Sequence, residues 1–589
     1  MSRKVDCSIQ VDVEEIRLDK VIHLSVVQRM DAHHTFDFRM KLGDAARDTF
    51  TDQAQKYLGK KALVRINFAP QTSESKDFSF DGVVTDAGLS RTQGGSPELS
   101  ISGHSPTLLL DAGNRNRSFS EKSLQQIVDE VCRDARSAKL GTEVKPGHSA
   151  QLPYIVQYEE TDHHLLVRLA ARYGEWYYFD GSKLVFGQPP AGDAENLVFG
   201  QNLFSFNIGL ALRPNSFELK NWDHLANELI SADSSAGALG LEGDDYGKLL
   251  KDPAQELFKP GPITMLGHVS DKADLDKRAL ALKRQTAASN VLLRGVSDNP
   301  RLRPGKRVKV TGPEGKDNDD GTTEYGEFMV VAVSHSSSHG NYQNHFEAVP
   351  TKSDLAPNGM ALRQPVCDPQ IAVVKENEDP EKLGRVRVQF LWQRGGPELS
   401  PWIRVLTAHA NAKGGVYLIP EVDDEVLVDF EFNDPERPFV AGSMYTGKGK
   451  PDSAWVSAKN ETKAFRTKGG NEIVIIDKAG KESIQVRNKD GKNEVTMTLG
   501  SEPSIVVKTT GKLTLDADTI ELRSKKLDVK TNSGSIVSDA DLKLEASDMA
   551  LKSKKLDVKT TTGGIVSDTE LKLEGSAMVT VKGGLVKLN

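Results

Sequence analysis

The residues whose types and spacing could do chemistry lie in two glycine-containing loops and in two histidine pairs. The segment Gly442-Ser-Met-Tyr-Thr-Gly-Lys-Gly449 comes close to a phosphate-binding loop. That motif needs Ser or Thr after the lysine to hold magnesium, and Gly449 stands there instead. Because no helix start follows either, we interpret the segment as a linker and predict no nucleotide cofactor.

An acidic loop places Asn318, Asp320, Gly321 and Glu327 at positions 3, 5, 6 and 12 of a calcium-loop pattern. Lys316 occupies position 1, where the pattern needs a ligand carboxylate, and flanking helices are not evident. A solvated acidic loop is the better interpretation.

The pairs His33-His34 and His163-His164 invite a metal interpretation. Adjacent residues of a helix point about 100° apart, so His163 and His164 are poor ligands for one ion. The chain contains no HExxH, GxSxG or CxxC motif, and no strained nucleophile turn supports a Ser–His–Asp triad. We therefore predict no catalytic residue and no metal site, so the protein is not expected to be an enzyme.

The composition is that of a soluble chain with several domains, since 589 residues exceed one compact core. A net charge of -7 gives no reason to expect nucleic acid or an anionic membrane as partner. Three distant cysteines favour a reducing compartment over a disulfide framework. The N-terminus has no apolar signal region, so we expect a cytoplasmic origin and any export without a signal peptide.

The stretch from Phe465 to Asn589 is repetitive. Its motifs recur at an offset of 29 residues: Ser524–Thr531 as Ser553–Thr560, Ile536–Asp539 as Ile565–Asp568, and Leu542–Glu545 as Leu571–Glu574. A fixed period without gaps is typical of stacked structural units. Apolar residues alternate with polar ones, as in Leu527-Asp528-Val529, which predicts short strands.

One copy of so thin a chain cannot cover its own apolar stripe, and open strand edges invite pairing. Closed cyclic self-assembly solves both problems, and we favour an intertwined three-stranded rod. A one-chain β-solenoid is the alternative, but the sequence lacks regular coils of 20–25 residues.

Residues 366–446 contain strand-like runs separated by Pro and Gly, which fits a small OB-fold barrel. The expected strands are Gln370–Lys375, Gly384–Phe390, Pro401–Thr407, Gly415–Ile419 and Glu425–Phe432, followed by Phe439–Met444. Oligonucleotide binding is disfavoured, because the stretch from Glu421 to Glu431 is acidic and few aromatic residues are available for stacking.

Four motifs of this region resemble the VgrG family, the spike proteins of type VI secretion systems, which are similar to hub and puncturing proteins of contractile phage tails. The motifs are Gly384–Trp392, Trp402–Val405, Tyr417–Phe430 and Asp434–Pro438. The first 360 residues fit the same family. Their expected elements are helices over Glu121–Ala138, His163–Ala170 (N-cap Thr161 or Asp162) and Lys272–Thr286, and strands at Gly174–Phe179, Leu184–Gly187, Arg301–Val310 and Tyr342–Phe346.

The resemblance implies a mainly β fold with small α insertions, assembled as a homotrimer. The expected domains are a hub of two tube-like β-barrels over 1–362, an OB-fold over 363–447, a linker over 448–464 and an intertwined triple-stranded β-helix over 465–589. Three copies of two barrels would match a hexameric tube. Residues 225–265 and 311–324 match poorly and are expected to be variable loops.

The resemblance also implies the function and the partners. The trimer would sit on the hexameric tube protein and baseplate, puncture target envelopes, carry effectors, and meet a membrane only transiently. A PAAR-type tip protein would dock on the residues Gly583, Gly584, Leu585, Val586, Lys587, Leu588 and Asn589. Two alternatives stay open: the spike of a phage tail or extracellular contractile injection particle, and a cell-wall hydrolase with a cryptic site in the hub.

Overall fold

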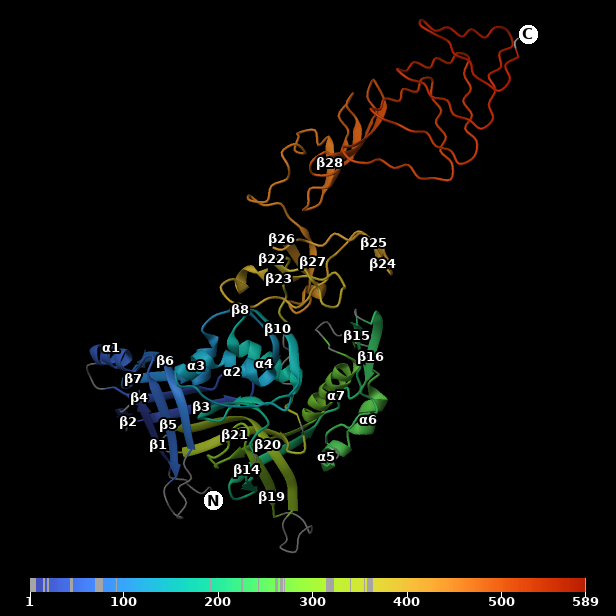
Figure 1. The fold of residues 1–589 in the computed structure, drawn as a ribbon. Helices are drawn as coiled ribbons and strands as arrows, with labels where there is room; N and C mark the ends of the chain where they lie inside the picture. Colours follow the sequence, from blue (N-terminus) through green and yellow to red (C-terminus); the bar gives the residue numbers. More distant parts are fainter. Residues whose placement is uncertain are drawn as a thin grey trace. The chain divides into compact units, whose positions relative to one another are not determined.

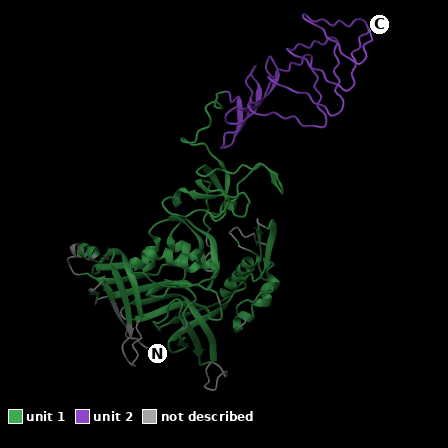
Figure 2. Cartoon of the chain, viewed as in Figure 1, with its two compact units in different colours: residues 1–458 green, residues 459–589 purple. Residues whose placement is uncertain are grey.

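The computed structural model describes residues 7–13, 16–18, 21–42, 46–68, 78–91, 93–190, 192–223, 226–241, 243–259, 263–264, 269, 271–313, 323–338, 341–353, 355–357 and 364–587. The chain divides into two compact units, residues 1–458 and 459–589 (Figures 1 and 2). All described helices belong to the first unit, whereas the second consists of strands and irregular segments.

A mostly antiparallel sheet of thirteen described strands forms the body of the first unit. Its hydrogen-bonded order is β14-β18-β21-β20-β3-β4-β7-β6-β5-β1-β2, with β19 paired to β20 and β13 to β19. The strands are β1 (Cys7–Val13), β2 (Ile16–Leu18), β3 (Val21–Arg29), β4 (Thr35–Lys41), β5 (Lys61–Phe68), β6 (Phe78–Ser90), β7 (Glu98–His104), β13 (Glu195–Val198), β14 (Leu203–Leu210), β18 (Val291–Ser297), β19 (Arg307–Gly312), β20 (Thr323–Ser338) and β21 (Asn341–Pro350).

Strand β20 joins the two halves of this sheet, because it pairs with β3 on one side and with β19 and β21 on the other. Alternate residues of a strand face opposite sides of the sheet. The inward-facing apolar residues gather in two separate cores, one around Phe36, Phe38 and Phe80 and the other around Phe328 and Phe346. The mainly β hub with two cores agrees with the predicted tandem arrangement.

Helices cover the first core through an insertion after β7. Its elements are η1 (Pro106–Asp111), β8 (Arg115–Ser123), α2 (Leu124–Val131), α3 (Arg133–Ser137), β9 (Gly141–Lys145), β10 (Gln151–Glu160), α4 (Asp162–Tyr173), β11 (Tyr177–Phe179) and β12 (Lys183–Gly187). The single helix expected over Glu121–Ala138 is two helices, divided at Cys132, where ψ is -2° rather than the roughly -42° of a regular helix. Helix α4 begins after Thr161, whose hydroxyl accepts the His164 N–H, and ends at the left-handed Gly174.

A second insertion packs helix α7 (Lys272–Ala288) against the hairpin of β15 (Glu218–Asp223) and β16 (Glu228–Asp233) (Figure 1). The helix predicted at Lys272–Thr286 is thereby confirmed. The same insertion also contains α5 (Asp245–Lys248), α6 (Lys251–Leu257) and β17 (Ile263–Thr264). The N-terminal helix α1 (Ala46–Tyr57) lies between β4 and β5.

The last part of the first unit is a small sheet of order β23-β22-β26-β27 around a core of its own. Its elements are β22 (Gln370–Glu376), β23 (Arg387–Phe390), η2 (Leu391–Gln393), β24 (Ala410–Asn411), β25 (Gly414–Gly415), β26 (Glu425–Phe430), η3 (Glu431–Asn433) and β27 (Pro438–Ser443). The strands expected over Pro401–Thr407 and Gly415–Ile419 were wrong for the single chain. Only isolated bridges form over Pro401–Thr407, from Ile403 to Val386 and from Val405 to Val440 of β27, because each neighbour pairs with the segment at a single position.

The second unit starts as a five-stranded antiparallel meander in simple sequence order. Its strands are β28 (Thr462–Arg466), β29 (Glu472–Ile476), β30 (Ser483–Arg487), β31 (Asn493–Thr498) and β32 (Ser504–Thr509). Residues 510–587 lie in no strand, although short strands were predicted there. A strand needs a hydrogen-bonded partner, and one copy of this segment supplies none.

Candidate assembly interface

One face of the β28–β32 meander is apolar across its five strands, apart from Lys463 on the edge strand β28. The strand register aligns two apolar rows across the sheet, Phe465–Ile473–Val486–Val495–Val507 and Ile475–Ile484–Met497–Ile505. These side chains stay largely in contact with solvent; Val486, on the central strand, is 46% exposed. A continuous apolar surface of this kind marks an interaction site.

The opposite face of the meander is more polar and carries an ion cluster that holds the strands in register. The Glu472 carboxylate is buried and pairs with the guanidinium groups of Arg466, at 2.5 Å, and of Arg487. Burial alone would raise the pKa of Glu472, but the two arginines outweigh it and hold that pKa below its usual range. Three neighbouring strands are thereby tied together, which keeps the apolar side chains on one face.

The repeat beyond β32 is divided by regular bends. They recur every seven or eight residues, near 511, 518, 525, 532, 539, 547, 554, 561, 568, 576 and 584. Each 29-residue repeat therefore contains four short extended segments. Apolar pairs such as Leu527 and Val529 stand on these segments and are exposed in the single chain.

Charged residues alternate with the apolar ones along the same segments. Lysine and acidic side chains two residues apart form the pairs Lys526–Asp528, Lys543–Glu545, Lys555–Asp557 and Lys572–Glu574. Because period-two alternation separates the two sets, one side of each segment suits water and the other suits burial. Further copies of the chain can cover the apolar side and pair the free backbone edges.

The residues predicted to dock a tip protein lie at the end of the second unit. Gly583, Gly584, Leu585, Val586 and Lys587 are exposed and lie in no strand. Leu588 and Asn589 are outside the described residues. Docking of a tip protein there stays a prediction.

The loops singled out for chemistry take structural roles where they are described. Thr446 Oγ1 accepts the Gly449 N–H at 2.8 Å, which closes a tight turn after β27 and leaves no helix start. In the calcium-like pattern, Glu327 lies on β20 and binds Arg307 at 2.7 Å. Lys316, Asn318, Asp320 and Gly321 lie outside the described residues.

The two histidines of each pair have different neighbours, but His33 of the first pair packs against His163 of the second. His33 lies between Asp111 and Thr107, at 2.8 Å from each, and its ring centroid is 3.9 Å from that of His163. This cluster resembles an acid–base–nucleophile relay. However, Thr107 is only 2% exposed and bonds to Ser105 Oγ, so a substrate carbonyl cannot reach it.

His34 turns instead toward Gln28, at 3.3 Å, and His164 lies on the helix beside His163. No local pattern predicts the His33–Asp111 contact, because the two residues come from distant segments. Among the described residues, no three His, Cys, Asp or Glu side chains form a group that could hold a metal ion.

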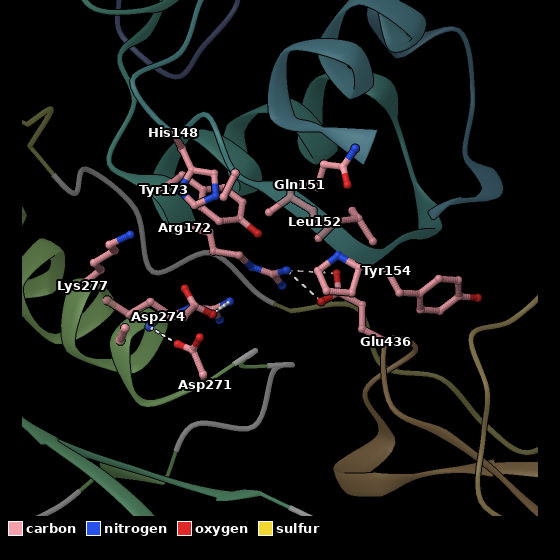
Figure 3. Close-up of a pocket in the computed structure, with 15 residues that line it drawn as sticks. His148, Gln151, Leu152, Tyr154, Arg172, Tyr173, Asp271, Asp274, Lys277 and Glu436 are labelled. Carbon is pink, nitrogen blue, oxygen red and sulfur yellow. Dashed lines mark hydrogen bonds and ion pairs between the residues drawn. The ribbon is translucent and has the colours of Figure 1, made fainter. Parts of the chain in front are cut away.

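A cavity of about 240 Å³ lies where the first insertion, α7 and the OB-like sheet meet (Figure 3). Its walls include His148, Tyr154, Asp274, Arg172 and Glu436. Arg172 Nη1 lies 2.7 and 3.0 Å from the two oxygens of Glu436. The opposite charges of Arg172 and Glu436 attract each other, and this ion pair links α4 to the OB-like domain.

Arg168 adds a second guanidinium at 3.4 Å from Glu436. Burial alone would raise the pKa of the Glu436 carboxyl, but Arg172 and Arg168 outweigh it and hold that pKa below its usual range. The ion cluster therefore ties the hub to the OB-like domain.

Comparisons with known families define the class of the first unit. Residues 33–341 match the phage tail baseplate hub (GPD) family, and residues 370–445 match the type VI secretion system/phage-baseplate injector OB domain. Because the first match covers more than half of the chain, the chain belongs to the phage tail baseplate hub family. The four-stranded sheet around β22 is the OB domain that the sequence predicted. None of the described helices is both long and apolar enough to cross a membrane.

The chain is similar to spike proteins from Pseudomonas aeruginosa. It is 29% identical over 431 residues to type VI secretion system spike protein VgrG4b, covering 63% of this chain and 50% of that relative. It is 28% identical over 420 residues to VgrG5, covering 63% and 51%. The chain thus spans about half the length of these curated relatives.

Solved structures share the fold. The lidded Francisella PdpA-VgrG complex matches with a TM-score of 0.55 and 8% identity, covering 86% of this chain and 81% of that one. The lidless PdpA-VgrG complex matches with a TM-score of 0.54 and 9% identity, covering 86% and 98%.

Proposed function

We propose that this chain is the structural spike protein of a type VI secretion system and acts as a homotrimer. The carrying observation is the exposed apolar face of the β28–β32 meander, which is followed by a repeat whose exposed apolar residues lie in no strand. Such a surface is stable only when other copies cover it. Three copies bury the rows around one axis and wind the repeats into a β-helical needle.

The other parts take their roles from this assembly. Three copies of a two-core hub present six similar units to the hexameric tube protein and the baseplate. The needle end, Gly583–Asn589, receives a PAAR-type tip protein, and effectors ride on the spike or the tip. The work is mechanical puncture rather than turnover. The spike assembles in the cytoplasm before it leaves the cell.

The test is complementation in the organism that encodes the chain. Deleting the gene should stop release of the tube protein into the medium, and the intact gene should restore it. A chain truncated after residue 458 should fail to restore release, because it lacks the needle. Undiminished release from the deletion strain would contradict the proposal, as would particles with a phage genome in place of a cell-bound apparatus.

A further inference from the structure

The OB domain carries an apolar surface of its own, on the segment 406–418, which we name the collar segment. Every residue from 408 to 418 is exposed. The exposed residues include Tyr417, at 80%, with Val416 and Leu418 beside it and Leu406 at the other end of the segment. Large apolar side chains grouped in this way on a small domain mark a contact surface.

The collar segment is a folded hairpin rather than a loose loop. Strands β24 and β25 pair within it, the Val416 N–H donates to the His409 carbonyl at 2.9 Å, and the Thr407 hydroxyl donates to the Val416 carbonyl at 2.8 Å. Gly415 has a φ of +125°, and a Cβ there would lie 2.5 Å from the His409 oxygen. The turn therefore requires glycine, and the apolar side chains are presented in one fixed arrangement.

The surface extends onto the loop before β23. A Cβ on Gly384 would lie 3.4 Å from the Tyr417 ring, so the ring rests alongside this backbone. The adjacent Leu383 is 56% exposed and continues the patch. Alternating apolar residues predicted a barrel strand at 415–419, but within that range only Gly415 lies in a strand, the short β25 that pairs with β24. Residues 416–419 therefore add no strand to the sheet of the OB domain in one copy.

We propose that the collar segment of each copy docks on the OB domain of the neighbouring copy and completes its apolar surface. The inference rests on the proposed homotrimer and deepens it. A second copy is the favoured occupant because only residues 444–461 separate β27 from β28. This linker spans at most about 60 Å. Copies joined through their second units therefore hold their OB domains at a high effective concentration.

The charges of the segment suit a head-to-tail contact. Exposed Lys413 lies at the hairpin turn, and Asp423, which also pairs with Lys375, follows the segment. A ring of three copies brings one patch of each copy against a different patch of the next. Opposite charges at the hairpin turn and beyond the segment favour this direction of contact.

The experiment uses the purified full-length chain with the photo-crosslinking residue benzoylphenylalanine in place of Tyr417. A matched control carries it in place of Glu398, which is exposed on the same domain outside the collar segment. Illumination should give covalent dimers and trimers at position 417, at least tenfold more than at 398. The double variant Tyr417→Ser/Leu418→Ser should raise the concentration at which the trimer half-dissociates by about tenfold or more.

Light scattering on the same samples separates the two proposals. A trimeric mass without cross-links above the control, together with unchanged dissociation of the double variant, overturns the collar contact and leaves the spike intact. A monomeric mass overturns the proposed function itself. Cross-links to other proteins in a lysate, with none in the purified chain, would also overturn the contact between copies.

Discussion

Replacing Val486 by serine tests the apolar face of the meander. Val486 lies on the central strand β30 and is 46% exposed in the single chain. Burying the rest of this side chain in a trimer is worth about 1 kcal/mol per copy. Symmetry repeats the change three times, so the trimer loses about 3 kcal/mol, or roughly 150-fold in its dissociation constant. The half-dissociation concentration depends on the square root of that constant and rises about 12-fold.

The assay is a dilution series at a constant mild urea concentration, with the mass read by light scattering after equilibration. The matched control is Gln485→Ser, the preceding residue on the polar face of the same strand. We expect the control to shift the midpoint by less than about threefold. Equal midpoints for both variants would refute the reasoning, because they would show that the apolar face contributes nothing to assembly.

Three further predictions concern the first unit. Glu436→Gln should lower the free energy of unfolding by about 3 kcal/mol in urea titrations, because it leaves Arg172 buried without its carboxylate. Burial lowers the pKa of His335 to about 3, below its unfolded value of about 6.5, so the unfolded chain takes up the proton first. Stability should therefore fall from pH 6.5 toward pH 3, by up to about 1.4 kcal/mol per pH unit for this residue, and His335→Gln should reduce that slope. Gly187→Ala should cost about 2 kcal/mol or more in a thermal melt, because φ is +117° and a Cβ would meet the Lys145 oxygen at 2.0 Å.

Each of these predictions has a control or a contradicting outcome. Lys272→Ala, which breaks an exposed ion pair, should change stability by less than about 0.5 kcal/mol, and an equal loss for Glu436→Gln would contradict the buried cluster. Identical slopes for the parent protein and His335→Gln would contradict the histidine assignment. Gly192→Ala meets open space and should leave the melting temperature nearly unchanged. An equal drop in melting temperature for Gly187→Ala and Gly192→Ala would contradict the role given to the backbone conformation at Gly187.

Local patterns were sufficient to predict much of the fold. Helix α7 and the capping of α4 at Thr161 follow from spacing and cap chemistry, both of which act within a few residues. The period of 29 residues predicted an extended repeat. Its division into four segments was missed, because the bend positions carry varied residues, among them Lys525, Asn532 and Asp539.

Contacts between distant segments could not be predicted in this way. The His33–Asp111 bond and the Arg172–Glu436 bond join elements that only tertiary packing brings together. The OB region failed differently. Its alternation predicted a strand at 415–419, but only Gly415 lies in a strand, because the partner strand β24 pairs over just two residues.

The mass of the full-length protein in solution tests the central claim most directly. Light scattering coupled to size exclusion should give three copies of the 64.4 kDa chain, about 193 kDa, at micromolar concentration. Truncation after residue 458 should greatly weaken this association, because it removes the apolar meander and the repeat. A full-length chain that remains monomeric, with its apolar rows in water, would contradict the account.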